Sequence, residues 1–137
     1  MADMNDFNTK IIEEFRANNG KVGGPFEDAA IVLLTTTGAK SGQPRVHPVV
    51  YRTDGGRMYV FASKAGAPTN PDWYYNLVAH PDISVEVGSD TFDVTATEIK
   101  GAERDRIYAD QAREFPGFAD YQANTDRVIP VIALDRR

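Results

Sequence analysis

The sequence predicts a mainly β fold, a closed or nearly closed antiparallel barrel decorated with helices. About six short segments are rich in β-branched and aromatic residues or alternate between apolar and polar positions, as half-buried strands do. Glycine-containing turns join several of these segments directly, and the regular strand–helix–strand alternation of a doubly wound sheet is missing. The 137 residues suit one domain, 1–137, in which residues 1–24 form an N-terminal helix and loop.

The first half of the chain is predicted to form a helix and three strands. Residues 3–19 place apolar side chains at three- and four-residue steps, which is typical of an amphipathic helix, and glycines end it. Strands follow over 29–37 and 44–52, with a turn at 38–42. Pro44 and Pro48 cannot donate to a neighbouring strand, so the second strand is expected at an edge or a bulge. The Asp54-Gly-Gly turn leads into a strand over 57–63.

The second half is predicted to contain two helices and three strands. After a loop, Asn70 is a good N-cap and Pro71 suits the first position of a helix that Pro81 ends. Residues 83–87 and 91–99 alternate as strands do. Residues 102–114 are expected to be helical, 115–121 form a short aromatic segment, and a last strand covers 128–134.

Composition excludes several classes of chemistry. The chain has no cysteine, which removes disulfides, thiolate metal sites and cysteine nucleophiles. Its two histidines belong to no cluster with metal-ligand spacing, so no metal is expected. Neither a catalytic triad nor a paired-carboxylate motif stands out. Reactive chemistry would then come from a bound cofactor, which fits a redox protein.

The N-terminus and the absence of long apolar runs bear on location. The first residues are polar and acidic, unlike a secretory signal, and no apolar run is long enough to span a bilayer. A cytoplasmic protein is therefore expected. Peripheral contact with the inner face of the plasma membrane through the N-terminal helix stays open, although packing explains its apolar stripe more simply. The oligomeric state is not predicted.

Charge is distributed unevenly along the chain. The net charge is −5 and the isoelectric point is near 4.9, which argues against nucleic acid as a partner. Residues 38–64, however, contain five cations and one anion, a net charge of +4, so the rest of the chain carries −9. A basic island in an acidic protein is a plausible footprint of a small polyanionic ligand.

Three constellations could carry this ligand. The first is the turn in Leu34-Thr-Thr-Thr-Gly-Ala-Lys-Ser-Gly-Gln-Pro-Arg45, where free backbone amides lie beside Lys40, Ser41 and Arg45. Amides and cations are what a phosphate or carboxylate cradle requires, but the GxxxxGK spacing of a Walker A loop is missing. A solvated hairpin tip is an equally good reading of this segment taken alone.

The second constellation is Phe61-Ala-Ser-Lys64 with the helix that begins at Pro71. A strand ending in Ser-Lys beside a helix N-terminus favours anions. Trp73, Tyr74 and Tyr75 could stack on a planar ring, although Trp73 and one tyrosine serve equally well as core residues. Asn76 could be a cap or a ligand contact.

The third constellation is Phe115-Pro-Gly-Phe118-Ala-Asp-Tyr121, with aromatic residues at steps of three. This spacing can wall an apolar pocket, and the Tyr121 hydroxyl can donate a proton or a hydrogen bond. Core packing is the competing interpretation.

These segments, with Asn70-Pro-Asp-Trp-Tyr-Tyr-Asn-Leu and Thr125-Asp-Arg-Val-Ile-Pro-Val, resemble the deazaflavin (F420)-dependent nitroreductases and F420H2-dependent quinone reductases of actinobacteria. The resemblance covers nearly the whole chain in order. It implies a split β-barrel of the flavin-reductase type that binds reduced coenzyme F420, a deazaflavin with a phosphate and polyglutamate tail. It also implies hydride transfer to a menaquinone-like quinone or a nitroaromatic acceptor.

The resemblance assigns roles to residues of this chain. Ser63 and Tyr121 are the implied catalytic residues, as candidates for hydrogen bonding or proton donation to the acceptor. The implied cofactor-binding residues are Ala39, Lys40, Ser41, Arg45, Val46, His47, Pro48, Val49, Val50, Phe61, Ala62, Ser63, Lys64, Asp72, Trp73, Tyr74, Tyr75, Asn76 and Phe118.

The chain also departs from the family pattern. A nitro-drug-activating member has tyrosines where this chain has Val50, Phe115 and Phe118, and only Tyr121 is retained. Phenylalanine keeps an apolar wall but loses the hydroxyl, so we expect quinones to be reduced and bicyclic nitroimidazoles to be poor substrates. Two alternatives remain at this point: an FMN-dependent split-barrel oxidoreductase and a non-catalytic F420 carrier.

Overall fold

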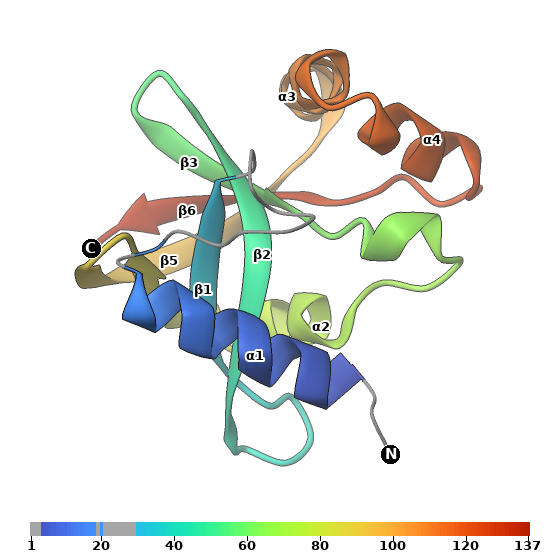
Figure 1. Ribbon diagram of the computed structural model, residues 1–137. Helices are drawn as coiled ribbons and strands as arrows, with labels where there is room; N and C mark the ends of the chain where they lie inside the picture. Colours follow the sequence, from blue (N-terminus) through green and yellow to red (C-terminus); the bar gives the residue numbers. More distant parts are fainter. Residues whose placement is uncertain (1–3, 19, 21–29) are drawn as a thin grey trace.

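Six antiparallel strands close into a barrel in the order β1-β2-β3-β6-β5-β4 (Figure 1). The computed structural model describes residues 4–18, 20 and 30–137, apart from the side chains of 4–8 and 65. The strands are β1 (Ile31–Thr37), β2 (Pro44–Asp54), β3 (Arg57–Phe61), β4 (Asp82–Val87), β5 (Asp90–Ile99) and β6 (Val131–Arg136). The predicted mainly β barrel with helices is confirmed.

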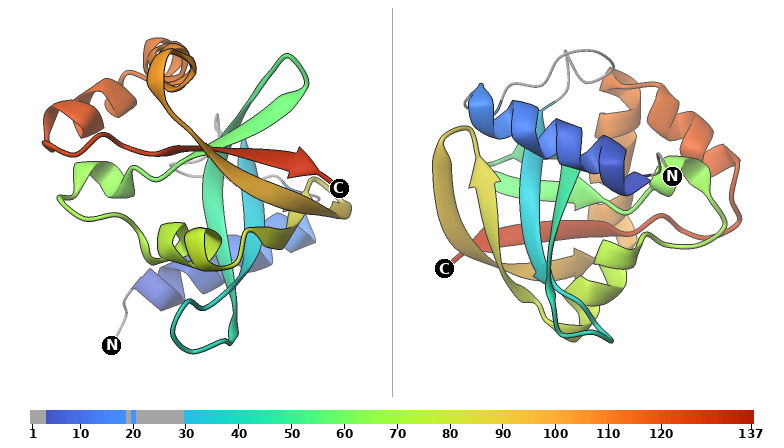
Figure 2. Two further views of the ribbon diagram at one scale, coloured as in Figure 1. Left: turned by 180° about the vertical axis from the view of Figure 1, so that it is seen from behind. Right: turned by 60° about the horizontal axis from the view of Figure 1, so that its bottom comes forward.

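Helices cover the barrel from several sides, as the two turned views show (Figure 2). They are α1 (Met4–Ala17), the 3-10 helix η2 (Lys64–Gly66), α2 (Asp72–Ala79), α3 (Gly101–Glu114) and α4 (Gly117–Ala123). The predicted aromatic segment 115–121 thus becomes mostly helix α4. The predicted loop at 21–25 lies outside the described residues, and so does the predicted strand start at 29.

Three predicted boundaries differ from the structure for local reasons. The last strand begins at Val131 rather than 128, because Pro130 precedes it and Val128 is exposed to solvent. The third strand ends at Phe61 rather than 63, because Ser63 already adopts a helical conformation before η2. Asn70 is not the N-cap of α2, since Pro71 occupies that position.

The strand β2 has an open edge along its first half. Residues 44–50 pair with β1, whereas pairing with β3 begins at Tyr51. Along the described chain no second strand pairs with 44–50, so this end of the β1–β2 hairpin leaves the barrel with one free side (Figure 1). Pro44 and Pro48, which lack a backbone donor, lie in this stretch, and the prediction of an edge position is confirmed there.

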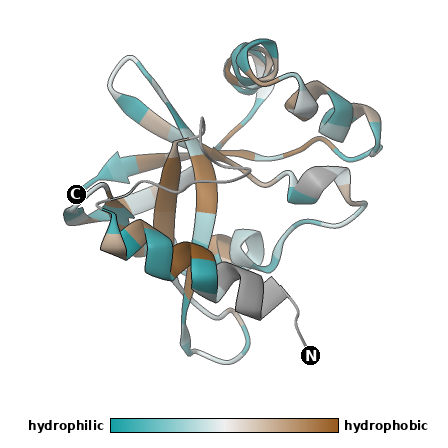
Figure 3. Ribbon diagram, in the orientation of Figure 1, coloured by the Kyte–Doolittle hydropathy of each residue, from teal (hydrophilic) through white to brown (hydrophobic). Residues whose placement is uncertain are grey.

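Apolar side chains form three clusters around the strands. One fills the barrel and includes Trp73 and Leu77 of α2. A second lies between β3, β6 and the helices α3 and α4. The third joins Ile11 and Phe15 of α1 to the outer face of β1 and β2, where hydrophobic residues of strands and helix meet (Figure 3). Burial of one apolar face therefore fixes α1, α2 and α3 on the barrel.

No group of three or more His, Asp or Glu side chains among the described residues could hold a metal ion. None of the helices described is long and apolar enough to cross a membrane.

Candidate functional site

The basic turn between β1 and β2 is exposed. Lys40, Ser41 and Arg45 all lie at the surface. Backbone bonds close the turn, with the Gly38 N–H donating to the Gln43 carbonyl at 2.8 Å and the Gly42 N–H to the Gly38 carbonyl at 3.0 Å. Neither Lys40 nor Arg45 has an ion-pair partner among the described residues. Two cations without ion-pair partners on a hydrogen-bonded turn fit a multiply anionic ligand.

A buried polar network fastens this turn to α2. The Asn76 side-chain oxygen accepts from the Ala39 N–H at 2.9 Å, and its amide nitrogen donates to Thr36 Oγ1 at 3.0 Å. Thr36 Oγ1 is also 3.1 Å from His47 Nε2. Asn76 and Thr36 are 7% and 1% exposed, so the bond between their side chains is shielded from water. The Asn76 side chain thus positions the turn from behind.

His47 is electrostatically part of this network. Burial lowers the pKa of its imidazole, while Asp72 opposes and Arg45 adds to the shift. Since Thr36 Oγ1 accepts from Asn76, its own proton is available to donate to an unprotonated His47 Nε2. A neutral imidazole fits this site best.

The predicted residues of β2 divide between two faces. Val46 and Val50 pack against α1, whereas Val49 packs with the barrel core. Pro48 is half-buried and pairs with Leu33. The free backbone side of 44–50 is therefore the part of this segment that faces no strand. A ligand along this edge would contact main chain and side-chain flanks.

The predicted aromatic residues of α2 have different surroundings. Trp73 is 8% exposed and packs in the barrel. The Tyr74 hydroxyl donates to Glu98 Oε1 at 2.6 Å, and burial together with this carboxylate raises the pKa of Tyr74 to about 12. Tyr75 is 49% exposed, and Asp72 is also exposed. Of the three aromatic rings, Tyr75 has the face that an external ring could reach.

The end of β3 leads into a tight loop that carries Ser63 and Lys64. Phe61 and Ala62 are buried, while Ser63 is half-buried and its hydroxyl makes no hydrogen bond to the described residues. Lys64 has φ +47°, an unusual value for a residue with a side chain. Its Nζ donates to Thr69 Oγ1 at 3.2 Å. Such backbone strain persists where surrounding contacts hold it.

Arg127 supplies those contacts and was not among the predicted site residues. Its guanidinium donates to the carbonyls of Ser63 at 2.7 Å, Ala62 at 3.0 Å and Ala67 at 2.9 Å. It also donates to Asn70 Oδ1 at 2.7 Å. Four bonds to one loop make Arg127 its central support. The sequence shows only an arginine before an apolar strand, a pattern that contains no sign of this role.

The helix α4 lies against this loop. A Cβ at Gly66, where φ is +81°, would come within 2.8 Å of the Tyr121 carbonyl oxygen, so only glycine permits this approach. The Phe118 ring packs edge-on to Phe61 at 5.5 Å and to Tyr121 at 5.2 Å between centroids. The Tyr121 hydroxyl has no hydrogen-bond partner within the described part of the chain. It is therefore free to donate to a ligand.

The predicted site segments form a row along one side of the barrel. The β1–β2 turn, α2, η2 and α4 follow one another there in every view (Figures 1 and 2). Cations lie at one end, and free hydroxyls with an aromatic wall lie at the other. This order suits an elongated cofactor with an anionic tail and a planar ring. The assignment of individual residues to that cofactor stays a prediction.

Comparison with known proteins places the chain in a family. A family model described as F420H(2)-dependent quinone reductase matches residues 9–136. An F420H(2)-dependent quinone reductase of Mycobacterium tuberculosis is 39% identical over 127 residues, which cover 90% of this chain and 85% of that protein. A solved F420-H2 dependent reductase, FDR-A, is 42% identical with a TM-score of 0.69, covering 77% of this chain and 93% of that chain.

A more distant structure agrees in fold alone. The haem storage protein HutZ from Vibrio cholerae is 17% identical with a TM-score of 0.61, covering 92% of this chain and 87% of that chain.

These matches confirm the predicted resemblance, the enzyme class and the cofactor, coenzyme F420, and they favour the reductase over the FMN enzyme and the carrier. The chain belongs to the F420H(2)-dependent quinone reductase family.

Proposed function

We propose that this chain reduces a quinone with F420H2, with the cofactor tail on the β1–β2 turn and the deazaflavin ring at the loop 61–64. The open edge of 44–50, with unpaired cations at one end and free hydroxyls at the other, is the observation that carries the proposal. Bound F420H2 supplies a hydride. Lys40 and Arg45 bind the anionic tail, and the Arg127-supported loop orients the ring end.

Two hydroxyls complete the chemistry at the acceptor. A quinone that receives a hydride becomes a quinolate, and one proton converts it to the quinol. The hydroxyls of Ser63 and Tyr121 make no internal hydrogen bond to the described residues and can stabilise the developing oxyanion or deliver that proton. Phe118 supplies an apolar wall beside Tyr121.

The same wall bears on nitroaromatic acceptors, which we propose to be poor substrates. Phe115 and Phe118 have no hydroxyl to polarise a nitro group, and Val50 packs against α1.

We also place the enzyme in the cytoplasm. Ile11 and Phe15 of α1 are buried on the barrel, which supports packing rather than membrane docking for that helix.

Cofactor binding tests this placement. Titration of the purified protein with F420, followed by fluorescence polarisation, should give binding, and FMN in the same assay should compete poorly. The double variant Lys40→Ala, Arg45→Ala should weaken F420 binding at least tenfold at low salt, with a smaller effect at high salt because exposed charges are screened.

A charge-matched control isolates position from net charge. The double variant Lys100→Ala, Arg137→Ala also removes two exposed cations, outside the predicted site. It should leave F420 affinity near the wild-type value. Equal losses in both double variants, or no loss in either, would refute the assignment of the tail to the turn.

A further inference from the structure

A cavity lies between β2 and α3, and no predicted cofactor-binding residue lines it. Its volume is about 270 Å³, and its lining includes Tyr51, Arg52, Gln111, Glu114 and Phe115. Ligand pockets for drug-sized molecules measure about 300–1,000 Å³, so this one suits a ring-sized group rather than a larger molecule.

Two nitrogen donors at this cavity are unsatisfied. Gln111 is 1% exposed, and its Nε2 has no hydrogen-bond partner among the described residues. The same holds for Arg52 Nε, which is also buried. A buried donor without a partner lowers the stability of the folded state. Two such donors at one cavity call for an explanation, and a ligand that supplies acceptor oxygens to both would explain them.

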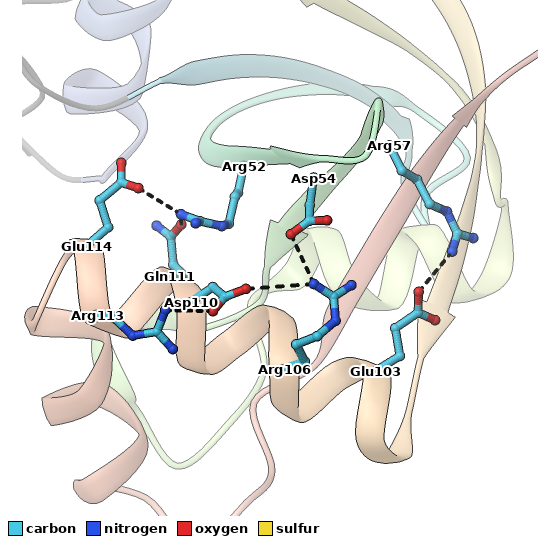
Figure 4. A network of polar contacts seen from close by, with 9 residues as sticks. All are labelled: Arg52, Asp54, Arg57, Glu103, Arg106, Asp110, Gln111, Arg113 and Glu114. Atoms are coloured by element: carbon cyan, nitrogen blue, oxygen red, sulfur yellow. Dashed lines mark hydrogen bonds and ion pairs between the residues drawn. The ribbon is translucent and has the colours of Figure 1, made fainter.

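The other polar atoms here are already paired and define the charge of the cavity. Arg52 donates to Glu114 Oε2 at 3.1 Å and, weakly, to Gln111 Oε1 at 3.5 Å, as Figure 4 shows. The Glu114 carboxylate offsets the Arg52 charge. The cavity therefore has two N–H donors and little net charge. This combination suits a neutral carbonyl group better than a phosphate or carboxylate. The terminal torsion of glutamine is broad, so the amide can turn Nε2 to an incoming oxygen.

This cavity adjoins the proposed acceptor wall. Phe115, which lines the cavity, accepts the Phe118 N–H at 3.0 Å through its carbonyl, one helical turn from the ring that packs on Tyr121. The two sites therefore share the Phe115–Phe118 turn.

We infer that Gln111 and Arg52 hold a carbonyl oxygen of the quinone acceptor, in the cavity between β2 and α3. The inference rests on the proposed function for its substrate class. It makes Gln111 an acceptor-binding residue and provides an acceptor for its Nε2, which has none among the described residues.

Gln111→Met tests this assignment, because methionine has a similar volume and no donor. With F420H2 and menadione, the KM for menadione should rise about three- to tenfold, which corresponds to the loss of one hydrogen bond. F420 affinity should stay at the wild-type value. The variant should be at least as stable as the wild type in thermal unfolding, because an unsatisfied buried donor is removed. Arg113→Met, on the exposed side of α3, is the control and should change none of these values.

A binding readout independent of turnover decides the same point. The Gln111 side-chain amide gives a pair of NMR resonances that Gln111→Met identifies by their absence. Menadione added to the wild-type protein should shift this pair in a saturable way. Unshifted resonances, or an unchanged menadione KM in Gln111→Met, would overturn the inference and leave water as the occupant. Failure of the wild type to bind F420 would overturn the proposed function instead, and the amide titration would still decide the cavity.

Discussion

Arg127 concentrates more hydrogen bonds on one loop than any predicted site residue does. Its pKa is lowered by burial, yet arginine stays charged in proteins, so the loop carbonyls bind a full cation. Lysine at this position keeps the charge but lacks the planar fork that reaches several acceptors at once.

We therefore expect Arg127→Lys to lower the free energy of unfolding by about 2 kcal/mol, measured by urea denaturation. F420 affinity should fall as well, since the loop carrying Ser63 and Lys64 loses its support. Arg113→Lys, on an arginine whose side chain is 75% exposed, should change neither quantity. An unaltered F420 affinity in a destabilised Arg127→Lys protein would mean that the loop is not part of the cofactor site.

His47 makes stability depend on pH. Its pKa in the folded protein lies below the ordinary value of 6.5, so between these two values the unfolded chain binds more protons than the folded one. Stability should therefore be full above about pH 7 and fall as the pH drops through the ordinary histidine pKa.

Urea unfolding measures this dependence at a series of pH values from about 5 to about 8, a range that brackets the ordinary histidine pKa. His47→Gln should remove part of the decline at low pH, whereas His80→Gln, on an exposed histidine, should retain it. Parallel curves for the wild type and His47→Gln would contradict the buried neutral imidazole.

At the scale of elements, the contact between η2 and α4 forms the ring end of the proposed site. Gly66 permits it, because a side chain there would meet the backbone of Tyr121. Gly66→Ala should displace α4 and with it Phe118 and Tyr121, lowering both stability and kcat for quinone reduction.

Gly56→Ala provides a matched control for this change. Gly56 has the same φ of +81° as Gly66, but nothing lies within 4 Å of the added Cβ. Both variants bear the backbone strain of about 1–2 kcal/mol, so the difference between them reports the contact with α4. Thermal unfolding and kcat should both be worse in Gly66→Ala. Equal effects would show that the approach of the two helices is not critical.

How far the sequence predicts the elements depends on the kind of signal. The alternation in 83–87 and 91–99 and the glycine turn after Asp54 are local, and β4, β5 and the β2–β3 turn lie where they are predicted. The cap of α2 is not predicted correctly, because Asn70 bonds to Arg127 from far along the chain. A competing tertiary partner of this kind leaves no periodic trace in the sequence.

At the scale of the whole molecule, the predicted barrel and family are confirmed, and the predicted site segments lie along one side of it. Spacing alone could not tell which side chains face outward. Trp73 and Asn76 both belong to the predicted binding segment. Trp73 packs inside the barrel, however, and the Asn76 side-chain amide is hydrogen-bonded to Ala39 of the turn and to Thr36. Nor could it find Gln111, whose significance lies in a buried side-chain nitrogen that has no partner among the described residues.

Quinone turnover is the most direct test of the proposed reductase activity. Purified wild-type protein is mixed anaerobically with F420H2 and menadione, and the return of F420 fluorescence is followed against reactions lacking protein or menadione. Oxidation should need both protein and menadione and should rise in proportion to the protein concentration. Oxidation no faster than in the protein-free reaction would contradict the proposed activity.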